Sequence, residues 1–138
     1  RLVELLQDTT LINLKAMCDM ARGQGAAMAF CSFAVPDYEH ASYEERAFFD
    51  WRLSTMLWGR HVNMRGYVHI TDVYNRCLKR RCKEWDALYV PVAERLKGDS
   101  TLFTDICHLQ IWGIERKAQL VYDALVPYLD ARLTHPDS

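Results

Sequence analysis

The sequence predicts an α/β protein with parallel strands. Residues 26–33 form a short, almost unbroken apolar run between a glycine turn and a proline, and a second short apolar run covers residues 88–92. Such runs are typical of strands buried inside a parallel sheet. A long helical pattern separates them, as a right-handed crossover between parallel strands requires. We therefore expect the first strand to be central and buried and to pair in parallel with the second.

The composition excludes several classes of protein. The 138 residues suit one domain, half of them hydrophobic and a quarter charged, as in ordinary globular proteins. The net charge of −1 excludes the broad basic surface with which proteins hold nucleic-acid phosphates. No apolar run approaches the roughly 20 residues of a membrane span, and nothing near Arg1 resembles a signal peptide. Because the first residue is Arg instead of Met, we expect the start of the gene product to lie upstream.

The five cysteines are odd in number and form no Cys-x-x-Cys pair. Free cysteine behaves as a small apolar residue, so we expect reduced, mostly buried thiols and no disulfide framework. These cysteines are Cys18, Cys31, Cys77, Cys82 and Cys107. Four histidines have no spacing typical of metal ligands and are expected at the surface or half-buried. They are His40, His61, His69 and His135.

Helical spacing covers three further stretches. The first stretch is residues 1–22. Asp8, Thr9 and Thr10 are expected to interrupt or restart this helix, and Gly23 and Gly25 are expected to end it. The second has its apolar stripe at Ile70, Val73, Tyr74, Cys77, Leu78, Cys82 and Trp85. Four basic residues are expected mostly on its solvated outer face, namely Lys79, Arg80, Arg81 and Lys83. The last begins near His108, with its stripe at Ile111, Ile114, Ala118, Val121 and Leu125 and with Pro127 near its end.

Residues 38–66 are expected to be a helical insertion between core elements. Ser42 and Glu45 fit a capping box, which predicts that a helix starts there. Its apolar stripe is Phe48, Trp51, Thr55 and Trp58, widened by Phe49, Leu53, Met56 and Leu57. We interpret this stripe as packing. The alternative is that Tyr38, Tyr43 and Trp51 line an acyl or sugar pocket, because an insertion after the carboxyl end of a strand lies near the ligand crevice of an α/β sheet.

Asp105 and His108 are the candidate catalytic residues. They stand three apart at the expected entrance of the last helix, so their side chains can meet. A carboxylate that accepts the Nδ1 proton of histidine fixes its tautomer and stabilises the imidazolium formed when Nε2 takes a proton. Such a pair needs only a serine or cysteine opposite Nε2 to complete a nucleophilic triad. Alone, the Asp-x-x-His spacing is a weak signal that favours a capping aspartate beside a surface histidine.

The wider string resembles the last conserved block of the SGNH/GDSL hydrolases. The matching residues are Phe103, Asp105, His108, Leu109, Gly113 and Ala118. Residues 11–36 and 88–96 resemble the helix–strand unit and the last strand that precede this block. The resemblance implies the C-terminal part of a flavodoxin-like three-layer α/β/α fold, with residues 1–138 a single partial domain. It also implies that Asp105 and His108 complete a Ser-His-Asp triad.

The blocks that supply the serine and the oxyanion-hole Gly and Asn in that family have no match here and are expected upstream. The triplet Gly98-Asp99-Ser100 has the residues of the family's serine block, but it stands in the wrong place along the chain. It is therefore interpreted as a turn, and Ser100 is not expected to be the nucleophile. Asn63 is not assigned to the oxyanion hole.

The leading hypothesis is therefore a serine esterase acting on a small-molecule ester, a lipid or an acylated sugar, with no metal or cofactor. The isolated chain is expected to be inactive and to self-associate through its truncated sheet. The alternative is a non-catalytic α/β binding or interaction module in which the Asp-His pair is structural.

Overall fold

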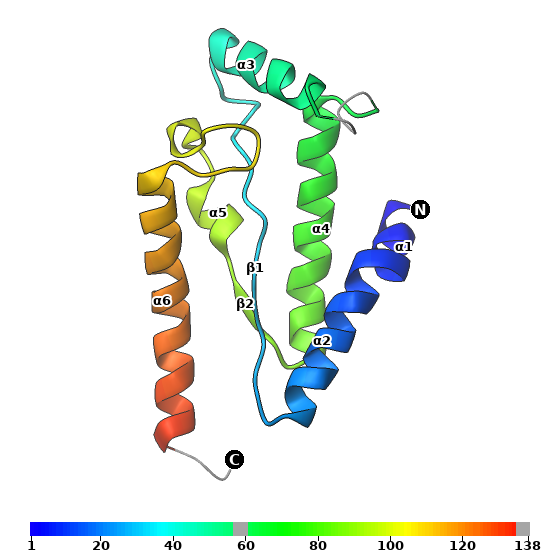
Figure 1. Ribbon diagram of the computed structural model, residues 1–138, viewed down its shortest axis with the longest axis vertical. Coiled ribbons are helices and arrows are strands. Elements are labelled where there is room, and N and C mark those ends of the chain that lie inside the picture. The colour runs from blue at the N-terminus through cyan, green and yellow to red at the C-terminus, as the bar shows by residue number, and fades with distance from the viewer. Residues whose placement is uncertain (57–60, 135–138) are drawn as a thin grey trace.

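The computed structural model describes residues 1–56 and 61–134, and these residues are mostly helical around one small parallel sheet (Figure 1). The sequence prediction of an α/β class with parallel strands is confirmed at this coarse level. Along the chain the elements are α1 (Leu2–Leu6), the π-helix η1 (Gln7–Leu11), α2 (Ile12–Gly23), β1 (Ala29–Cys31), α3 (Tyr43–Ser54), α4 (Met64–Glu84), β2 (Leu88–Val90), α5 (Val92–Leu96), the 3₁₀ helix η2 (Ser100–Leu102) and α6 (Ile111–Thr134).

The two strands pair in parallel, as predicted, with Ala29 opposite Leu88 and Cys31 opposite Val90. The prediction that residues 26–33 form a central strand buried on both faces is wrong. β1 has only three residues, of which Ala29 is exposed and the other two are half-buried. Because the described residues contribute two strands to the sheet, β1 has a neighbour on one edge only.

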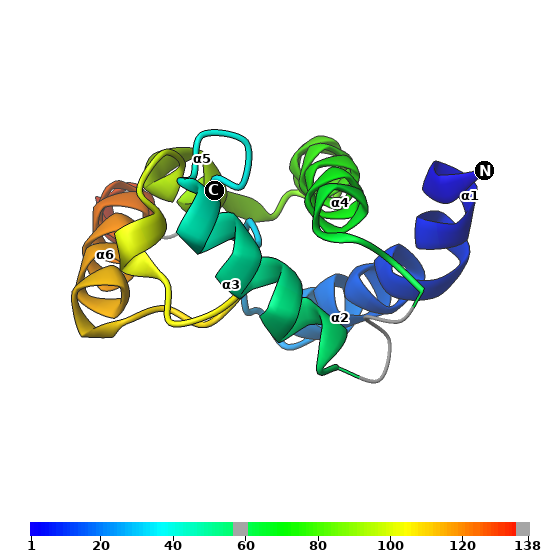
Figure 2. The same ribbon diagram turned by 90° about the horizontal axis from the view of Figure 1, so that it is seen from above.

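Helices flank the strands on two sides, with α6 on one side and α4 and α2 on the other (Figures 1 and 2). Both strands run toward the end of the molecule where α3 and the start of α6 lie (Figure 1). Pro91 ends β2 and stands directly before α5. In parallel α/β sheets, the carboxyl ends of the strands are where ligand sites form.

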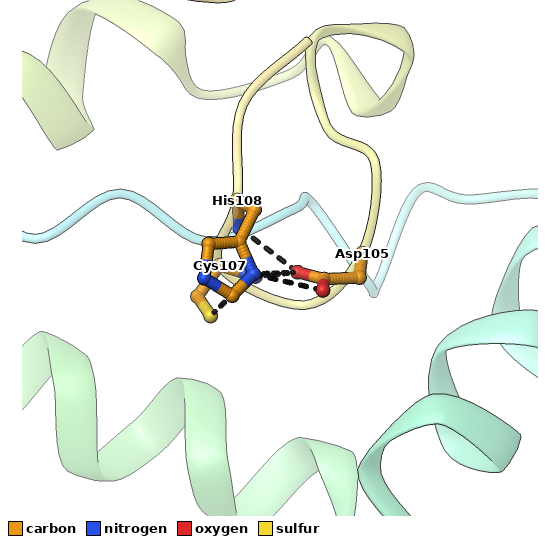
Figure 3. A group of neighbouring side chains, drawn as sticks. All are labelled: Asp105, Cys107 and His108. Atoms are coloured by element: carbon orange, nitrogen blue, oxygen red, sulfur yellow. Dashed lines mark hydrogen bonds and ion pairs between the residues drawn. The ribbon is translucent and has the colours of Figure 1, made fainter.

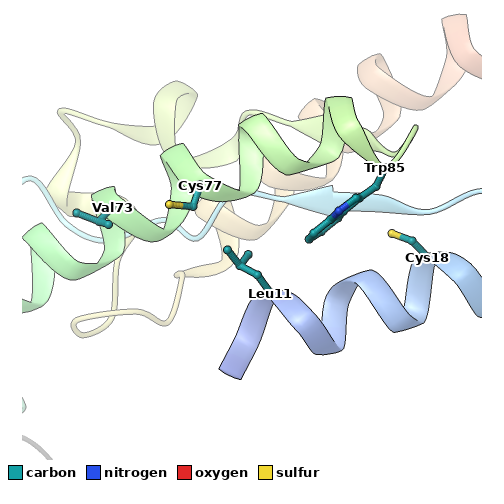
Figure 4. Close-up of a cluster of buried hydrophobic side chains, with 5 residues drawn as sticks. All are labelled: Leu11, Cys18, Val73, Cys77 and Trp85. Atoms are coloured by element: carbon teal, nitrogen blue, oxygen red, sulfur yellow. The ribbon is translucent and has the colours of Figure 1, made fainter. Parts of the chain in front are cut away.

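The first core cluster joins Leu11 of η1 and Cys18 of α2 to Val73 and Cys77 of α4 and to Trp85, which follows α4 (Figure 4). The predicted α4 stripe is confirmed except at Ile70, which is exposed. Three of the five cysteines, Cys18, Cys77 and Cys82, are buried, and all five are free thiols.

The N-terminal helix is interrupted where the sequence predicted it. The turn containing Asp8, Thr9 and Thr10 is π-helical, and the Thr9 hydroxyl donates a hydrogen bond to the Leu5 carbonyl at 2.7 Å. A threonine hydroxyl that bonds back to the preceding turn competes with the regular helical pattern. Gly23 is the last residue of α2, and Gly25 has a φ of +69°, which a residue with a side chain rarely adopts.

The capping box of α3 is confirmed, because the Ser42 side chain accepts from the Glu45 N–H and the Glu45 carboxylate accepts from the Ser42 N–H. The predicted stripe is wrong at Phe48 and Trp51, which are exposed, and right at two of its widening residues, Phe49 and Leu53, which are buried one turn apart. Thr55 is exposed as well. Residues 57–60, with Trp58 and Leu57 of the predicted stripe, lie outside the described part of the chain.

The predicted stripe of α6 is also wrong. Ile111, Ile114 and Ala118 are exposed, and of the predicted positions only Val121 and Leu125 are half-buried. α6 packs on α5, η2 and β2 along a line that includes Leu120, Val121 and Ala124. A helix supported on one narrow line leaves its remaining apolar positions uncovered. Pro127 lies inside α6. No described helix is both long enough and apolar enough to cross a membrane.

Candidate functional site

The segment between η2 and α6 is a closed loop that presents Asp105 and His108. Phe103 and Leu109 form an antiparallel bridge at its base, and the Thr104 N–H donates to the His108 carbonyl at 2.8 Å. Ile106 is fully buried in the second core cluster with Phe49, Leu53 and Met64. The sequence placed His108 at the start of the last helix, but it stands in this loop, three residues before α6. The bridge and the buried Ile106 together fix the loop against α3 and α4.

The side chains of Asp105 and His108 are paired, as predicted (Figure 3). Nδ1 of His108 lies 2.8 Å from Oδ2 and 3.0 Å from Oδ1 of Asp105. The same Oδ1 accepts hydrogen bonds from the backbone N–H groups of Cys107 at 3.0 Å and His108 at 2.9 Å. The histidine ring is thus held by a carboxylate that the loop backbone itself fixes.

Arg52 of α3 adds a positive charge to the far side of the pair, with its Nη2 3.3 Å from Asp105 Oδ2. The Asp105 side chain is only 6% exposed. Burial raises the pKa of Asp105, but the N–H groups of Cys107 and His108, the His108 side chain and Arg52 together hold it well below its ordinary value. Asp105 is therefore a carboxylate at neutral pH.

His108 itself is accessible. Its side chain is 73% exposed, and no group of residues 1–56 or 61–134 is recorded as bonded to Nε2. A neutral imidazole with Nδ1–H donated to a carboxylate has its Nε2 lone pair available to accept a proton. Such an arrangement is chemically able to accept or donate a proton at Nε2.

Cys107 is a third donor group at this loop that the sequence analysis did not assign to the site. Its sulfur is 3.6 Å from His108 Nδ1, and donor atoms of Asp105, Cys107 and His108 all lie within 4.8 Å of one another. Burial raises the pKa of the Cys107 thiol, and the Asp105 charge raises it further, while a hydrogen bond from the Tyr67 hydroxyl lowers it. The signal in the sequence was the string Asp105-Ile106-Cys107-His108, which places three types of metal ligand within four residues.

A second Asp-x-x-His pair occurs at Asp37 and His40, where the sequence predicted only a surface histidine. His40 is exposed, and its Nδ1 lies 2.9 Å from Asp37 Oδ1 and 3.0 Å from Oδ2. These two residues line a cleft of about 210 Å³, together with residues of α4 and α5. Here the only backbone donor to the carboxylate is the His40 N–H at 3.4 Å, and no described arginine bonds to it. This pair therefore has the same side-chain contact as Asp105 and His108, with weaker support.

The remaining predicted positions have structural surroundings. The Ser100 hydroxyl donates to the Glu45 carboxylate at the start of α3. Asp99 caps the short η2 helix by accepting from the Thr101 N–H, which confirms a turn at Gly98-Asp99-Ser100. Asn63 caps α4 by accepting from the Gly66 N–H at 2.8 Å.

Of the three aromatic residues considered for a ligand pocket, Tyr38 lines the cleft beside Asp37 and His40. Tyr43 and Trp51 are exposed on α3. His61 and His69 are exposed, as predicted, and His135 lies outside the described residues.

No protein-family model matches the chain, and no curated protein or solved structure matches it either. The function is therefore inferred from the geometry of the loop and from the resemblance of its sequence.

Proposed function

We propose that this chain carries the acid–base pair of an ester hydrolase of the SGNH/GDSL type. The observation that supports the proposal is the hydrogen bond from His108 Nδ1 to the buried, charged carboxylate of Asp105, which leaves Nε2 facing outward. In this proposal Asp105 orients His108 and stabilises its imidazolium form. His108 takes the proton of a serine and later gives it to the departing alcohol.

The serine and the oxyanion donors belong, in this proposal, to a segment that precedes Arg1. The finer fold assignment, a flavodoxin-like α/β/α layer structure, is part of the same proposal. Its support is the parallel β1–β2 pair, the α4 crossover between the strands, and the position of the Asp105 loop at the end toward which both strands run (Figure 1). The substrate class is a carboxylic ester, whether a simple ester, a lipid or thioester, or an acetylated sugar.

The test is ester hydrolysis by the polypeptide that includes the upstream sequence, with p-nitrophenyl acetate as the substrate. His108→Ala should lower kcat at least about a thousandfold, because the serine then has no base. The matched control is His40→Ala, which removes the histidine of the other Asp-His pair and should leave kcat unchanged. Ser100→Ala should also leave kcat nearly unchanged, since the bond recorded for Ser100 is to Glu45. Equal losses in the two histidine variants would contradict the proposal.

The chain of residues 1–138 provides a second arm of this test. It should hydrolyse the same ester no faster than its own His108→Ala variant, because the nucleophile is supplied elsewhere. Turnover in this chain that disappears with Ser100→Ala would overturn the proposal that the serine lies upstream.

A non-catalytic module is the second candidate, and two observations favour it. Asp105 bonds two backbone N–H groups of its own loop, which is a structural role in itself. The pair Asp37 and His40 also shows that this contact forms at a site with no assigned chemistry. If the pair is structural in a non-catalytic module, the longer polypeptide should hydrolyse the ester no faster than its His108→Ala variant, so the same variant distinguishes the two candidates.

A further inference from the structure

The Asp105 loop holds three different metal-binding groups on one side of a fixed turn. The carboxylate of Asp105, the sulfur of Cys107 and Nδ1 of His108 all lie within 4.8 Å of one another (Figure 3). Carboxylate oxygen, thiolate sulfur and imidazole nitrogen are the ligand types that zinc takes in proteins. Among the described residues, no other group of three histidine, cysteine or acidic side chains converges in this way.

One of the ligand distances, that between the sulfur of Cys107 and Nδ1 of His108, is close to that of a tetrahedral site. With bonds of about 2.3 Å to sulfur and about 2.0 Å to nitrogen, a tetrahedral ion separates the two ligand atoms by roughly 3.5 Å. The sulfur of Cys107 and Nδ1 of His108 are 3.6 Å apart. The corresponding separation of nitrogen and oxygen is about 3.4 Å, whereas His108 Nδ1 now lies 2.8 and 3.0 Å from the Asp105 oxygens. An ion therefore requires His108 to move away by about half an ångström, which its exposed ring permits.

The surroundings favour ligation by these groups. Arg52 and the backbone N–H groups of Cys107 and His108 hold the carboxylate of Asp105. Hydrogen-bond donors around a metal-ligating group orient that group for the ion. Hydrogen bonding to Tyr67 lowers the pKa of the Cys107 thiol, while burial and Asp105 raise it.

We propose that Asp105, Cys107 and His108 bind one divalent ion of the zinc class, with solvent completing the coordination. The Cys107 thiol releases its proton on binding, and the proton on His108 Nδ1 moves to Nε2, so that the neutral imidazole binds the ion through Nδ1. The inference does not rest on the proposed function. If both hold, an ion on Nδ1 separates His108 from Asp105 and therefore inhibits hydrolysis.

The first experiment titrates Co²⁺ alone into the reduced, metal-free 138-residue chain. We expect the near-ultraviolet band of sulfur-to-cobalt charge transfer together with the intense visible bands of tetrahedral Co²⁺, and Zn²⁺ should displace both. Cys107→Ser should abolish the charge-transfer band, and His108→Ala should weaken Co²⁺ binding at least about tenfold. Matched controls are Cys31→Ser, which removes the other half-buried thiol, and His40→Ala, which removes the Asp-His pair that lacks a cysteine. Neither control should change the affinity more than about twofold.

A charge-transfer band that survives in Cys107→Ser, or Co²⁺ spectra with no sulfur contribution, would overturn the proposal. A second measurement on the unaltered chain does not depend on the folding of any variant. Zn²⁺ should slow the alkylation of Cys107 by N-ethylmaleimide, followed by peptide mass spectrometry, at least about tenfold, and should leave the alkylation rate of Cys31 unchanged. An equal rate at Cys107 with and without Zn²⁺ contradicts the proposal. Neither result depends on ester turnover, so failure of the metal site and failure of the hydrolase are observed separately.

Discussion

Replacing Asp105 by alanine should destabilise the fold more than any change at the exposed His108. The carboxylate accepts from two backbone N–H groups and from Arg52, and its side chain is only 6% exposed. A lost bond costs about 1 kcal/mol when water partly replaces the missing acceptor. We therefore expect Asp105→Ala to lower the free energy of unfolding by about 2–3 kcal/mol, which is roughly 10 °C in Tm for a chain of this size. Asp105→Asn keeps an oxygen for the backbone donors and should cost about 1 kcal/mol.

The measurement is urea denaturation followed by circular dichroism, with Asp37→Ala as the matched control. Asp37 has the same side-chain contact with a histidine, but the only backbone N–H recorded on its carboxylate lies at 3.4 Å and no described arginine bonds to it. Its replacement should cost less than about 1 kcal/mol. If the two alanine variants lose equal stability, the argument that backbone donors fix the Asp105 loop is refuted.

Four further outcomes are expected. Because the net effect of its surroundings lowers the pKa of Asp105 below the ordinary 3.8, its contribution to stability is full above that pH and is lost as the pH falls below it. Urea titrations should accordingly show a steeper acid loss in the unaltered chain than in Asp105→Asn. Ile106→Ala should cost about 2–4 kcal/mol in the same assay, since Ile106 is fully buried against α3 and α4. Gly113→Ala should lower the free energy of unfolding by about 1–3 kcal/mol, because the new Cβ would lie 2.5 Å from the Leu102 carbonyl oxygen. The control is Gly23→Ala, whose Cβ would meet nothing within 4 Å and which should leave the Tm unchanged or raise it in thermal melts. Self-association through the open edge of β1 stays a prediction. Ala29→Pro should lower the dimer fraction in sedimentation experiments. An unaltered chain that is monomeric at every concentration would contradict self-association.

Local patterns of the sequence predicted the individual elements well. The capping box at Ser42 and Glu45 placed the start of α3 correctly, because its two hydrogen bonds involve neighbouring residues only. The interruption at Thr9 is local in the same sense. The parallel pairing of β1 and β2 followed from the helix between them, since a crossover of this length favours one topology.

Burial could not be predicted from the same patterns. Phe48, Ile111 and Ile114 are as apolar as the residues that are buried, but the described chain places no element over them. An apolar side chain shows that burial would be favourable, whereas the covering surface decides whether it occurs. The run at residues 26–33 was predicted to be buried on both faces because its side chains are apolar. Among the described residues, the sheet places only one strand beside it.

The contact between Asp105 and His108 was predictable from spacing, but the features that distinguish it from Asp37 and His40 were not. Both pairs have an Asp and a His three apart, and both have Nδ1 within 3.0 Å of the carboxylate. They differ in residues distant in the chain or adjacent in the loop: Arg52 lies 53 positions before Asp105, and Cys107 occupies the place that Glu39 has in the other pair.

These neighbours decide what each pair is able to do. A carboxylate held by an arginine and two backbone donors keeps its charge and its position when the histidine is protonated, as a catalytic pair requires. A neighbouring thiol adds the ligand that turns the same pair into a candidate metal site. The pair at Asp37 and His40 has the motif without either addition, so it tests both proposals from within the same chain. An effect that appears at His108 and not at His40 belongs to the surroundings of the pair, and an effect that appears at both belongs to the motif alone.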